Sequence, residues 1–316
     1  MKLGIKTTTL KAVFIFLSKL IVGALAFVIG LMVGGRLASL LGLPAPTLPP
    51  EMDANAAMLT MFATSPLLVL VLYLVGRKLA GSWLARTFML ALFAWIAYTV
   101  NNVIEAVIFS NYVTNPWFTL SMFTPAVLLC AGVTAWLFPA GPRGVAFVRT
   151  WQVYFRQRAP KAWGWRLFSA AVIFMPIYYL FGLLVVPFVG DYYRQGAFGL
   201  ALPTLATLLP VLFVRSVLFL VACLPVVVAW RGTSRRLWWS LGFALFVCVG
   251  LLNLLAANWI PGWVRAIHLA EILADSLVYA GALVWLLSSG TTGRPVKFLR
   301  SANPLNQGSQ ALFTEK

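Results

Sequence analysis

The positive charges of this chain are confined to its two ends and to every second gap between long apolar runs. All but four of its 24 Lys and Arg residues lie in those regions or, like Lys19, in the part of an apolar run next to one of them, and the four others are Arg36, Arg194, Arg215 and Arg265. The same regions contain a single acidic residue, Glu315. Short loops of multi-pass membrane proteins show this bias because basic residues stay on the cytoplasmic side. The pattern therefore predicts a polytopic membrane protein with both termini in the cytoplasm.

The composition agrees with this class and excludes an ordinary soluble domain. Of the 316 residues, 61% are hydrophobic and 10% are charged, whereas soluble domains contain about 25% charged residues. The net charge of +17 is spread over short loops beside apolar runs, which favours anionic lipid headgroups over nucleic acid as a partner. Cys130, Cys223 and Cys248 lie inside apolar runs without a CxxC pattern, so we expect no disulfide framework, no zinc ribbon and no cofactor.

Apolar runs of spanning length recur eight times, since about 20 residues are needed to cross a hydrocarbon core of about 30 Å. We expect an all-α transmembrane bundle in which the first run is a retained helix and not a cleaved signal peptide. The bacterial plasma membrane is the expected location. The predicted spans are about 12–35, 58–76, 86–110, 117–138, 165–189, 204–229, 237–258 and 264–287.

The two halves of the chain resemble each other, which predicts a four-plus-four internal repeat. LYLVGR at 72–77 corresponds to VVVAWR at 226–231, and Asn101 corresponds to Asn253. Because each unit has an even number of spans, the copies would share one orientation, as in transporters built from parallel repeats. The predicted division is a first repeat at 1–140, a basic amphipathic linker at 141–164, a second repeat at 165–290 and a basic tail at 291–316.

The linker between the halves combines basic residues with aromatic residues at helical spacing. Phe147, Trp151, Tyr154 and Phe155 stand at i, i+4, i+7 and i+8, which puts them on one face of a helix. One interpretation is a helix in the cytoplasmic membrane interface with its aromatic face against the lipid, and the other is an ordinary basic loop. The predicted lipid-contacting residues are Arg149, Trp151, Tyr154, Phe155, Arg156 and Arg158.

Polar residues inside the spans are the candidates for a functional site, because a charge in hydrocarbon costs at least about 2.5–3.5 kcal/mol. In the third span, Tyr98 is expected to share one helix face with the polar residues that follow it, at about 100° per residue. The candidates for a substrate or ion pathway are Asn101, Asn102, Glu105, Arg215, Asn253, His268, Glu271 and Asp275.

Depth along the helices links these candidates. Arg215 and Asp275 each lie about a dozen residues from the outer end of their span, which is near the middle of the membrane at about 1.5 Å per residue. An arginine at that depth needs an acidic partner, and Asp275 or Glu271 is the expected one. We therefore predict a polar cavity in the outer half of the bundle, lined by spans three, six, seven and eight, with Arg215 at its floor.

Three functions are compatible with such a cavity. The first is a transporter or permease for a small solute or ion, in which Arg215 binds an anionic group or controls a neighbouring carboxylate, and His268 titrates near neutral pH. The second is a scaffold or complex subunit with a structural ion pair. The third is a metal-dependent enzyme with His268, Glu271 and Glu105 as ligands. The chain lacks GxSxG, Walker and Rossmann patterns, which argues against a hydrolase, an ATPase domain or a dinucleotide site. Of the three functions, an enzyme is the least expected.

Overall fold

The computed structural model describes residues 7–49, 51–110, 115–140 and 147–288, and every regular element in these ranges is helical. Within these described ranges, eight spans are long and apolar enough to cross a membrane, so the prediction of an all-α bundle with eight transmembrane helices is confirmed. The helices are α1 (Thr7–Leu40), α2 (Ala54–Gly76), α3 (Trp83–Ala94), η1 (Trp95–Val100), α4 (Asn101–Phe109), α5 (Pro116–Leu137), α6 (Phe147–Phe155), α7 (Pro160–Val172), α8 (Phe174–Arg194), η2 (Ala197–Gly199), α9 (Leu205–Ala229), α10 (Ser234–Phe246), η3 (Val247–Leu251), α11 (Leu252–Ala256) and α12 (Gly262–Leu287).

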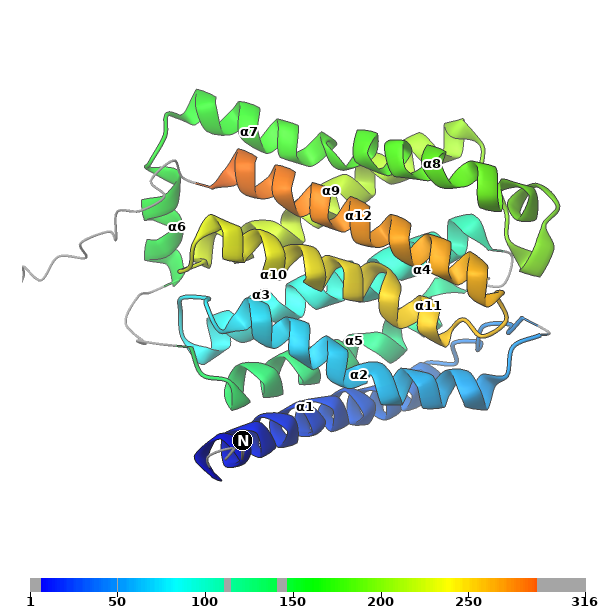
Figure 1. The fold of residues 1–316 in the computed structure, drawn as a ribbon, viewed down its shortest axis with the longest axis horizontal. Coiled ribbons are helices and arrows are strands. Elements are labelled where there is room, and N and C mark those ends of the chain that lie inside the picture. The colour runs from blue at the N-terminus through cyan, green and yellow to red at the C-terminus, as the bar shows by residue number, and fades with distance from the viewer. Residues whose placement is uncertain (1–6, 50, 111–114, 141–146, 289–316) are drawn as a thin grey trace, which may run out of the picture.

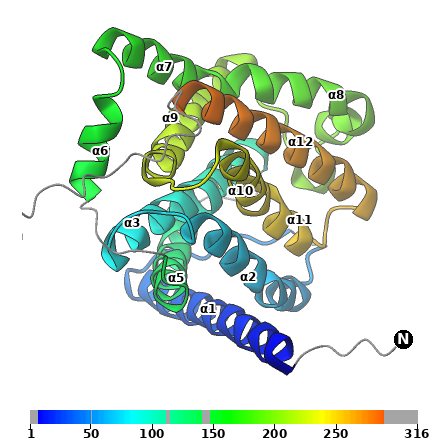
Figure 2. The same cartoon turned by 60° about the vertical axis from the view of Figure 1, so that its left-hand side comes forward.

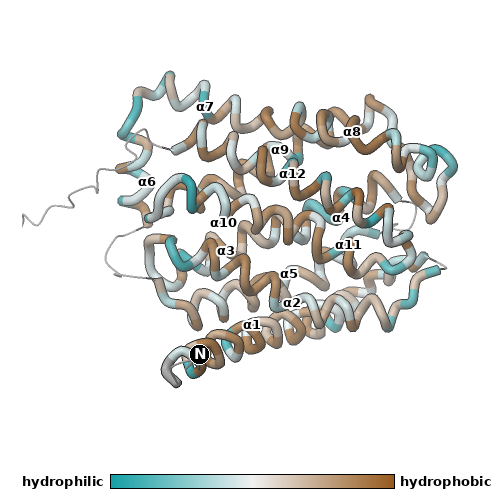
Figure 3. Tube along the Cα trace, viewed as in Figure 1, coloured by the Kyte–Doolittle hydropathy of each residue, from teal (hydrophilic) through white to brown (hydrophobic). Residues whose placement is uncertain are grey.

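The spans are layered between two outer edges. One edge is α1 and the opposite edge is α7 with α8, as both views of the bundle show (Figures 1 and 2). The span α9 and the span formed by α10, η3 and α11 are the most buried, whereas α1 and the α7–α8 span are the least buried. Apolar residues cover most of the helix lengths, and polar residues gather at the helix ends (Figure 3). This distribution fits a bundle whose outer helices face lipid.

The bundle has two chemically different ends. At the end on the left of Figure 1, called the basic end, α6 lies beside the end of α12, and α1 begins at the same end on the opposite edge of the bundle. The other end, called the distal end, holds the turns from α1 to α2, α4 to α5, α8 to α9 and α11 to α12. The described cations at the basic end include Arg77, Lys78, Arg149, Arg156, Arg158, Lys161, Arg231, Arg235 and Arg236. Residues 141–146 of the predicted linker and the predicted tail at 291–316 lie outside the described residues.

The third and seventh spans each contain a π-helical segment in their middle, η1 and η3. After η1 the backbone N–H of Asn101 bonds to the carbonyl of Ile96, and after η3 the N–H of Leu252 bonds to that of Val247. Each bond reaches five residues back, so one extra residue is accommodated in the turn and the following helix is rotated relative to an uninterrupted α-helix. The two segments contact each other.

The fifth span is interrupted at Ile173, between α7 and α8. Pro176 lies in the first turn of α8, where its missing N–H costs no bond within that helix, although it prevents α7 from continuing unbroken. The interruption puts Phe174, which is buried, at the start of a new helix facing α9 and α12.

The two halves contact each other in a reciprocal way. The second span of the first half, α2, packs against α10 and α11, while the second span of the other half, α9, packs against α3 and η1. At the basic end the two equivalent turns pair through Leu79 and Trp230, with Ala80 N–H donating to the carbonyl of Ala229 at 2.9 Å. These correspondences support the four-plus-four repeat, which stays a prediction.

The linker contains a helix, as one of the two interpretations of its sequence expected, but the aromatic face of this helix is not turned toward lipid. In α6, Tyr154 is buried and its hydroxyl donates to the carbonyl of Leu287 at the end of α12. Trp151 and Phe155 pack against the bundle core, and the Trp163 indole N–H donates to the Phe155 carbonyl at 2.9 Å. The aromatic stripe therefore covers the basic end of the bundle. The last carbonyls of α12 have no partner within that helix, and the Tyr154 hydroxyl is a donor to one of them. Arg149 and Arg156 are exposed.

Candidate functional site

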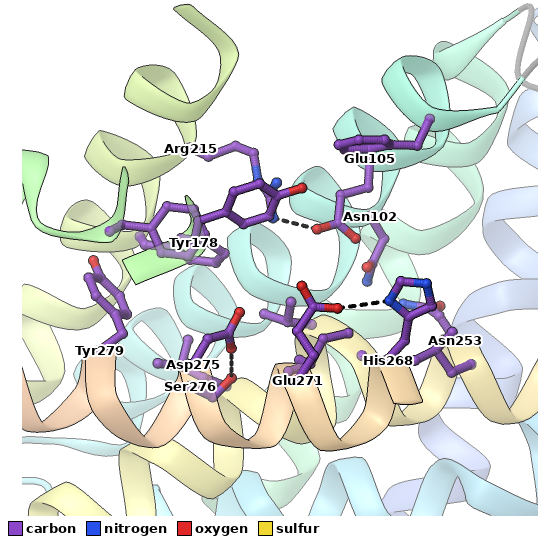
Figure 4. A pocket seen from close by; sticks show the side chains of 18 of the residues that line it. Asn102, Glu105, Tyr178, Arg215, Asn253, His268, Glu271, Asp275, Ser276 and Tyr279 are labelled. Atoms are coloured by element: carbon purple, nitrogen blue, oxygen red, sulfur yellow. Dashed lines mark hydrogen bonds and ion pairs between the residues drawn. The ribbon is translucent and has the colours of Figure 1, made fainter. Parts of the chain in front are cut away.

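A cavity of about 200 Å³ lies between α4, α8, α9, α10, η3, α11 and α12 (Figure 4). Seven of the eight predicted site residues line it, and the eighth, Asn101, contacts the guanidinium of Arg215 beside it. The lining residues from the sequence prediction are Asn102, Glu105, Arg215, Asn253, His268, Glu271 and Asp275. The sequence therefore identified side chains that the fold brings together.

One face of α12 forms the longest wall of the cavity. Val264, His268, Glu271, Asp275 and Tyr279 all line it, and they stand at i, i+4, i+7, i+11 and i+15, which is a single helix face. Fifteen residues of α-helix rise about 22 Å. The cavity therefore extends from the distal end past the midpoint of this 26-residue helix.

Arg215 of α9 is buried and is held by partners from the other half of the chain. Its Nε donates to Asn101 Oδ1 at 2.9 Å, and its Nη2 forms an ion pair with the Glu105 carboxylate. Its guanidinium carbon also lies 5.3 Å from the ring centre of Phe174 and 5.2 Å from that of Tyr178, within the range of cation–π attraction. The expected pair with Asp275 or Glu271 is wrong, because α4 supplies the carboxylate that reaches Arg215.

His268 and Glu271 form a second pair, one turn apart on α12. His268 Nδ1 lies 2.8 Å from Glu271 Oε2, and its Nε2 lies 3.2 Å from the Tyr193 hydroxyl. Since a carboxylate only accepts, Nδ1 carries the proton, and in the neutral ring Nε2 accepts from the tyrosine. The side chains of His268 and Glu271 are 16% and 11% exposed, so this pair is shielded on most sides.

Asp275 lies deeper along α12 and differs from the other two carboxylates. It is buried, and its carboxylate accepts a hydrogen bond from the Ser276 hydroxyl at 3.2 Å. Among the described residues it makes no ion pair, whereas Glu105 and Glu271 each have one. Figure 4 shows its carboxylate turned to the same side of α12 as that of Glu271, toward the space below Tyr178.

The fifth span was missing from the predicted lining, and it contributes Phe174, Tyr178 and Tyr193. Tyrosines in an apolar run carry no charge to draw attention to them, and the break before Pro176 is the one signal in the sequence that could have indicated a bend toward the interior. Asn102 adds a link between the halves, because its Nδ2 donates to the Cys248 carbonyl of η3 at 3.1 Å.

Tyr98 does not share the face of the polar residues that follow it. It is buried against Phe27 and Phe123 in the first half of the bundle and is not part of the cavity wall. The prediction assumed an uninterrupted α-helix from Tyr98 to Glu105. Tyr98 lies inside the π-helical segment η1 (Trp95–Val100), whose wider turn rotates the following residues, so Asn102 and Glu105 point in a different direction from Tyr98.

The metal site considered from the sequence does not assemble. In the described part of the chain, no group of three His, Cys, Asp or Glu side chains is placed to hold a metal ion. His268 and Glu271 are close together, but the third proposed ligand, Glu105, is bound by Arg215. A guanidinium beside the site also opposes the binding of a cationic metal by that carboxylate.

The chain is a multi-pass membrane protein with a charged cavity between its spans. Comparison of the chain with protein-family models, with curated proteins and with solved structures found no match.

Proposed function

We propose that the protein is a transporter for a small solute or ion, and that the cavity is its binding site. The observation that carries this proposal is a cavity that enters the bundle from one end, passes the middle of α12 and is lined by Arg215, Glu105, Glu271, Asp275 and His268. Ionisable residues inside a membrane bundle are costly and often mark ion or solute pathways. Substrate sites near the membrane midplane, between two halves, are typical of secondary transporters.

The closed side of the cavity fits this proposal. Beyond its deepest aromatic residues, Phe219 and Tyr279, the bundle continues toward the basic end with fully buried residues such as Ala222, Cys223 and Leu283. The described conformation therefore offers access from the distal end alone. A transport cycle requires a second conformation in which access changes sides, and rocking of one half against the other is the usual means.

The proposal includes an orientation and a lipid partner. With the basic end in the cytoplasm, as the charge bias favours, the cavity opens to the non-cytoplasmic side. The exposed Arg149 and Arg156 of α6 would then contact the anionic headgroups of the inner leaflet.

Two measurements on one preparation test the transport proposal. In the first, Ser276→Cys, which lines the cavity, is treated with a charged, water-soluble methanethiosulfonate, with Ser216→Cys as the matched control. Both serines are buried, but Ser216 is not part of the cavity wall, and the native cysteines are buried as well. We expect modification of Ser276→Cys and not of Ser216→Cys, since water reaches only the former.

In the second measurement, a panel of labelled small cations, anions and neutral solutes is offered to proteoliposomes. We expect saturable uptake of at least one solute, and its loss in the Glu271→Gln, Asp275→Asn double variant. The exposed Asp191→Asn serves as the control. An unmodified Ser276→Cys together with no uptake by folded protein would reject the proposal.

A scaffold role is the second candidate, and one observation favours it. Arg215 is bonded to Asn101 and Glu105 and contacts two aromatic rings, as a structural cross-link between α9 and α4 would be. In that case the cavity is a packing defect, and both measurements above give negative results.

A further inference from the structure

Arg215 contributes a positive charge to the cavity, and this charge is already paired with the Glu105 carboxylate. Its Nε and Nη2 are bonded to Asn101 and Glu105, and the rings of Phe174 and Tyr178 lie beside its guanidinium. An anion that approached Arg215 would have to displace the Glu105 carboxylate or be repelled by it. Arg215 therefore fixes Glu105 in place and does not provide a site for an anionic group.

The remaining charges leave the cavity short of cations. Glu105 is matched by Arg215 and Glu271 by His268. Asp275 has the Ser276 hydroxyl as its hydrogen-bond partner and makes no ion pair with any described residue. Even with His268 protonated, the carboxylates lining the cavity outnumber its cations by one. A buried carboxylate without a counter-charge is costly, so Asp275 either takes up a proton or is stabilised in its charged form by a positively charged occupant.

The deep end of the cavity supplies surfaces that suit an organic cation. Tyr279 stands one turn beyond Asp275 on α12, and its side chain is 2% exposed. The rings of Phe174 and Phe219 lie 5.4 and 6.0 Å from that of Tyr279, and all three line the cavity. Aromatic faces attract cations.

We propose that the cavity binds a small organic monocation, an alkylammonium, whose charged group lies against the Asp275 carboxylate and whose hydrocarbon part contacts the rings of Phe174, Phe219 and Tyr279. This inference rests on the proposed transport function and gives its substrate class. The cavity volume of about 200 Å³ corresponds to on the order of six water molecules at about 30 Å³ each. A ligand with a handful of non-hydrogen atoms therefore fits.

Equilibrium binding to the purified, detergent-solubilised protein tests the charge class. The probes are n-butylammonium, butyramide and butyrate, which have similar size and are cationic, neutral and anionic. We expect butylammonium to bind and butyrate not to bind. Asp275→Asn, which keeps the shape of the side chain, should weaken butylammonium binding at least about tenfold, equivalent to about 1.4 kcal/mol. Asp191→Asn, at an exposed position of α8, should bind like the parent protein.

The outcomes separate this inference from the transport proposal. Binding of butyrate or butyramide as tight as that of butylammonium overturns the cation class but leaves the cavity as a solute site. The class is equally overturned when folded protein does not bind butylammonium, or when Asp275→Asn binds it unchanged. Monodisperse elution of each variant establishes that it is folded.

Discussion

At the scale of single residues, Arg215 is the side chain on which the interior of the bundle depends most. Replacing it with leucine leaves the Glu105 carboxylate without its cation and Asn101 Oδ1 without its donor. We expect Arg215→Leu to destabilise the protein by about 3 kcal/mol, the lower end for a broken buried pair, because Glu105 is 30% exposed. Thermal unfolding of the detergent-solubilised protein measures the change.

A double-mutant comparison identifies the partner of Arg215. Adding Glu105→Gln to Arg215→Leu removes the orphaned charge and should recover part of the loss. Adding Asp275→Asn should show the smaller coupling with Arg215, since those two side chains form no ion pair among the described residues. A larger coupling with Asp275 than with Glu105 would contradict the geometry of the site.

At the basic end, Tyr154 is the buried residue of α6 that connects this helix to the end of α12. Its hydroxyl donates to the Leu287 carbonyl, so Tyr154→Phe should cost about 1 kcal/mol. Burial raises the pKa of Tyr154 above its ordinary value of 10.0, although Arg158 and Arg166 oppose the shift. Above about pH 10 the unfolded chain therefore binds fewer protons at this residue than the folded protein, and stability falls as pH rises.

The pH dependence gives this prediction its measurement. Thermal unfolding of the parent protein and of Tyr154→Phe is followed from neutral pH to above pH 10. The advantage of the parent protein should be constant below about pH 10 and shrink above it, because phenylalanine does not titrate. Curves that stay parallel through that range would show that Tyr154 is not buried against Leu287.

At the scale of elements, the closest helix contact in the first half joins α1 to α5 through two glycines. A Cβ added at Gly34 would lie 2.2 Å from the Met122 carbonyl oxygen, and one added at Gly30 would lie 2.4 Å from Ala126 Cα. Glycines four residues apart allow helix backbones to approach in membranes. Gly35, the next residue of α1, has no heavy atom within 4 Å of its added Cβ and provides a matched control.

We expect Gly34→Ala to destabilise the protein by about 1–3 kcal/mol, because the backbone of α5 must move to admit the methyl group. Gly35→Ala should be neutral or slightly stabilising, since alanine favours a helix more than glycine does. The midpoint temperature of thermal unfolding is measured for both variants, and it should be lowered in Gly34→Ala and not in Gly35→Ala. Equal effects would mean that α1 does not pack on α5 through this face.

Elements differ in how far the sequence could reveal them. The eight spans were predictable, because their apolar length is set by the thickness of the bilayer. The π-helical turns η1 and η3 were not, since they are built from the same apolar residues as the α-helix around them. This explains why Tyr98 was put on the wrong face. Glu105 was not recognised as the partner of Arg215 for another reason, because counting depth along the helices matched Arg215 with Asp275. For α6, the aromatic stripe was visible in the sequence, but a stripe does not say whether lipid or protein covers it.

At the scale of the whole molecule, the polar residues of the site were predictable because they differ from the apolar residues around them. A polar side chain in hydrocarbon is expensive, so the few that occur inside the spans were expected to meet one another. The fold brings them together across both halves, with Glu105 on α4 and Asp275 on α12 lining one cavity. The tyrosines of α8 escaped prediction because an uncharged aromatic residue is equally at home in a packed core or a cavity wall.

The orientation of the whole molecule decides which compartment the cavity serves, and a matched pair of glutamines can report it. Gln195 is exposed at the distal end, after α8, and Gln157 is exposed at the basic end, after α6. The native cysteines Cys130, Cys223 and Cys248 are buried, so a membrane-impermeant maleimide should react only with an introduced thiol. With the basic end in the cytoplasm, Gln195→Cys is labelled on intact cells, and Gln157→Cys only after the membrane is permeabilised.

The opposite labelling would reverse the compartment from which solute enters, since the cavity is closed toward the basic end by Ala222, Cys223 and Leu283. The charges at Arg231, Arg235 and Arg236 would then have crossed the membrane, against the bias that retains short basic loops. Labelling of both thiols on intact cells would indicate a mixed orientation. The even number of described spans puts Thr7 and Leu287 on the same side of the membrane. Labelling of one member of the cysteine pair on intact cells therefore determines the side of every turn in the bundle.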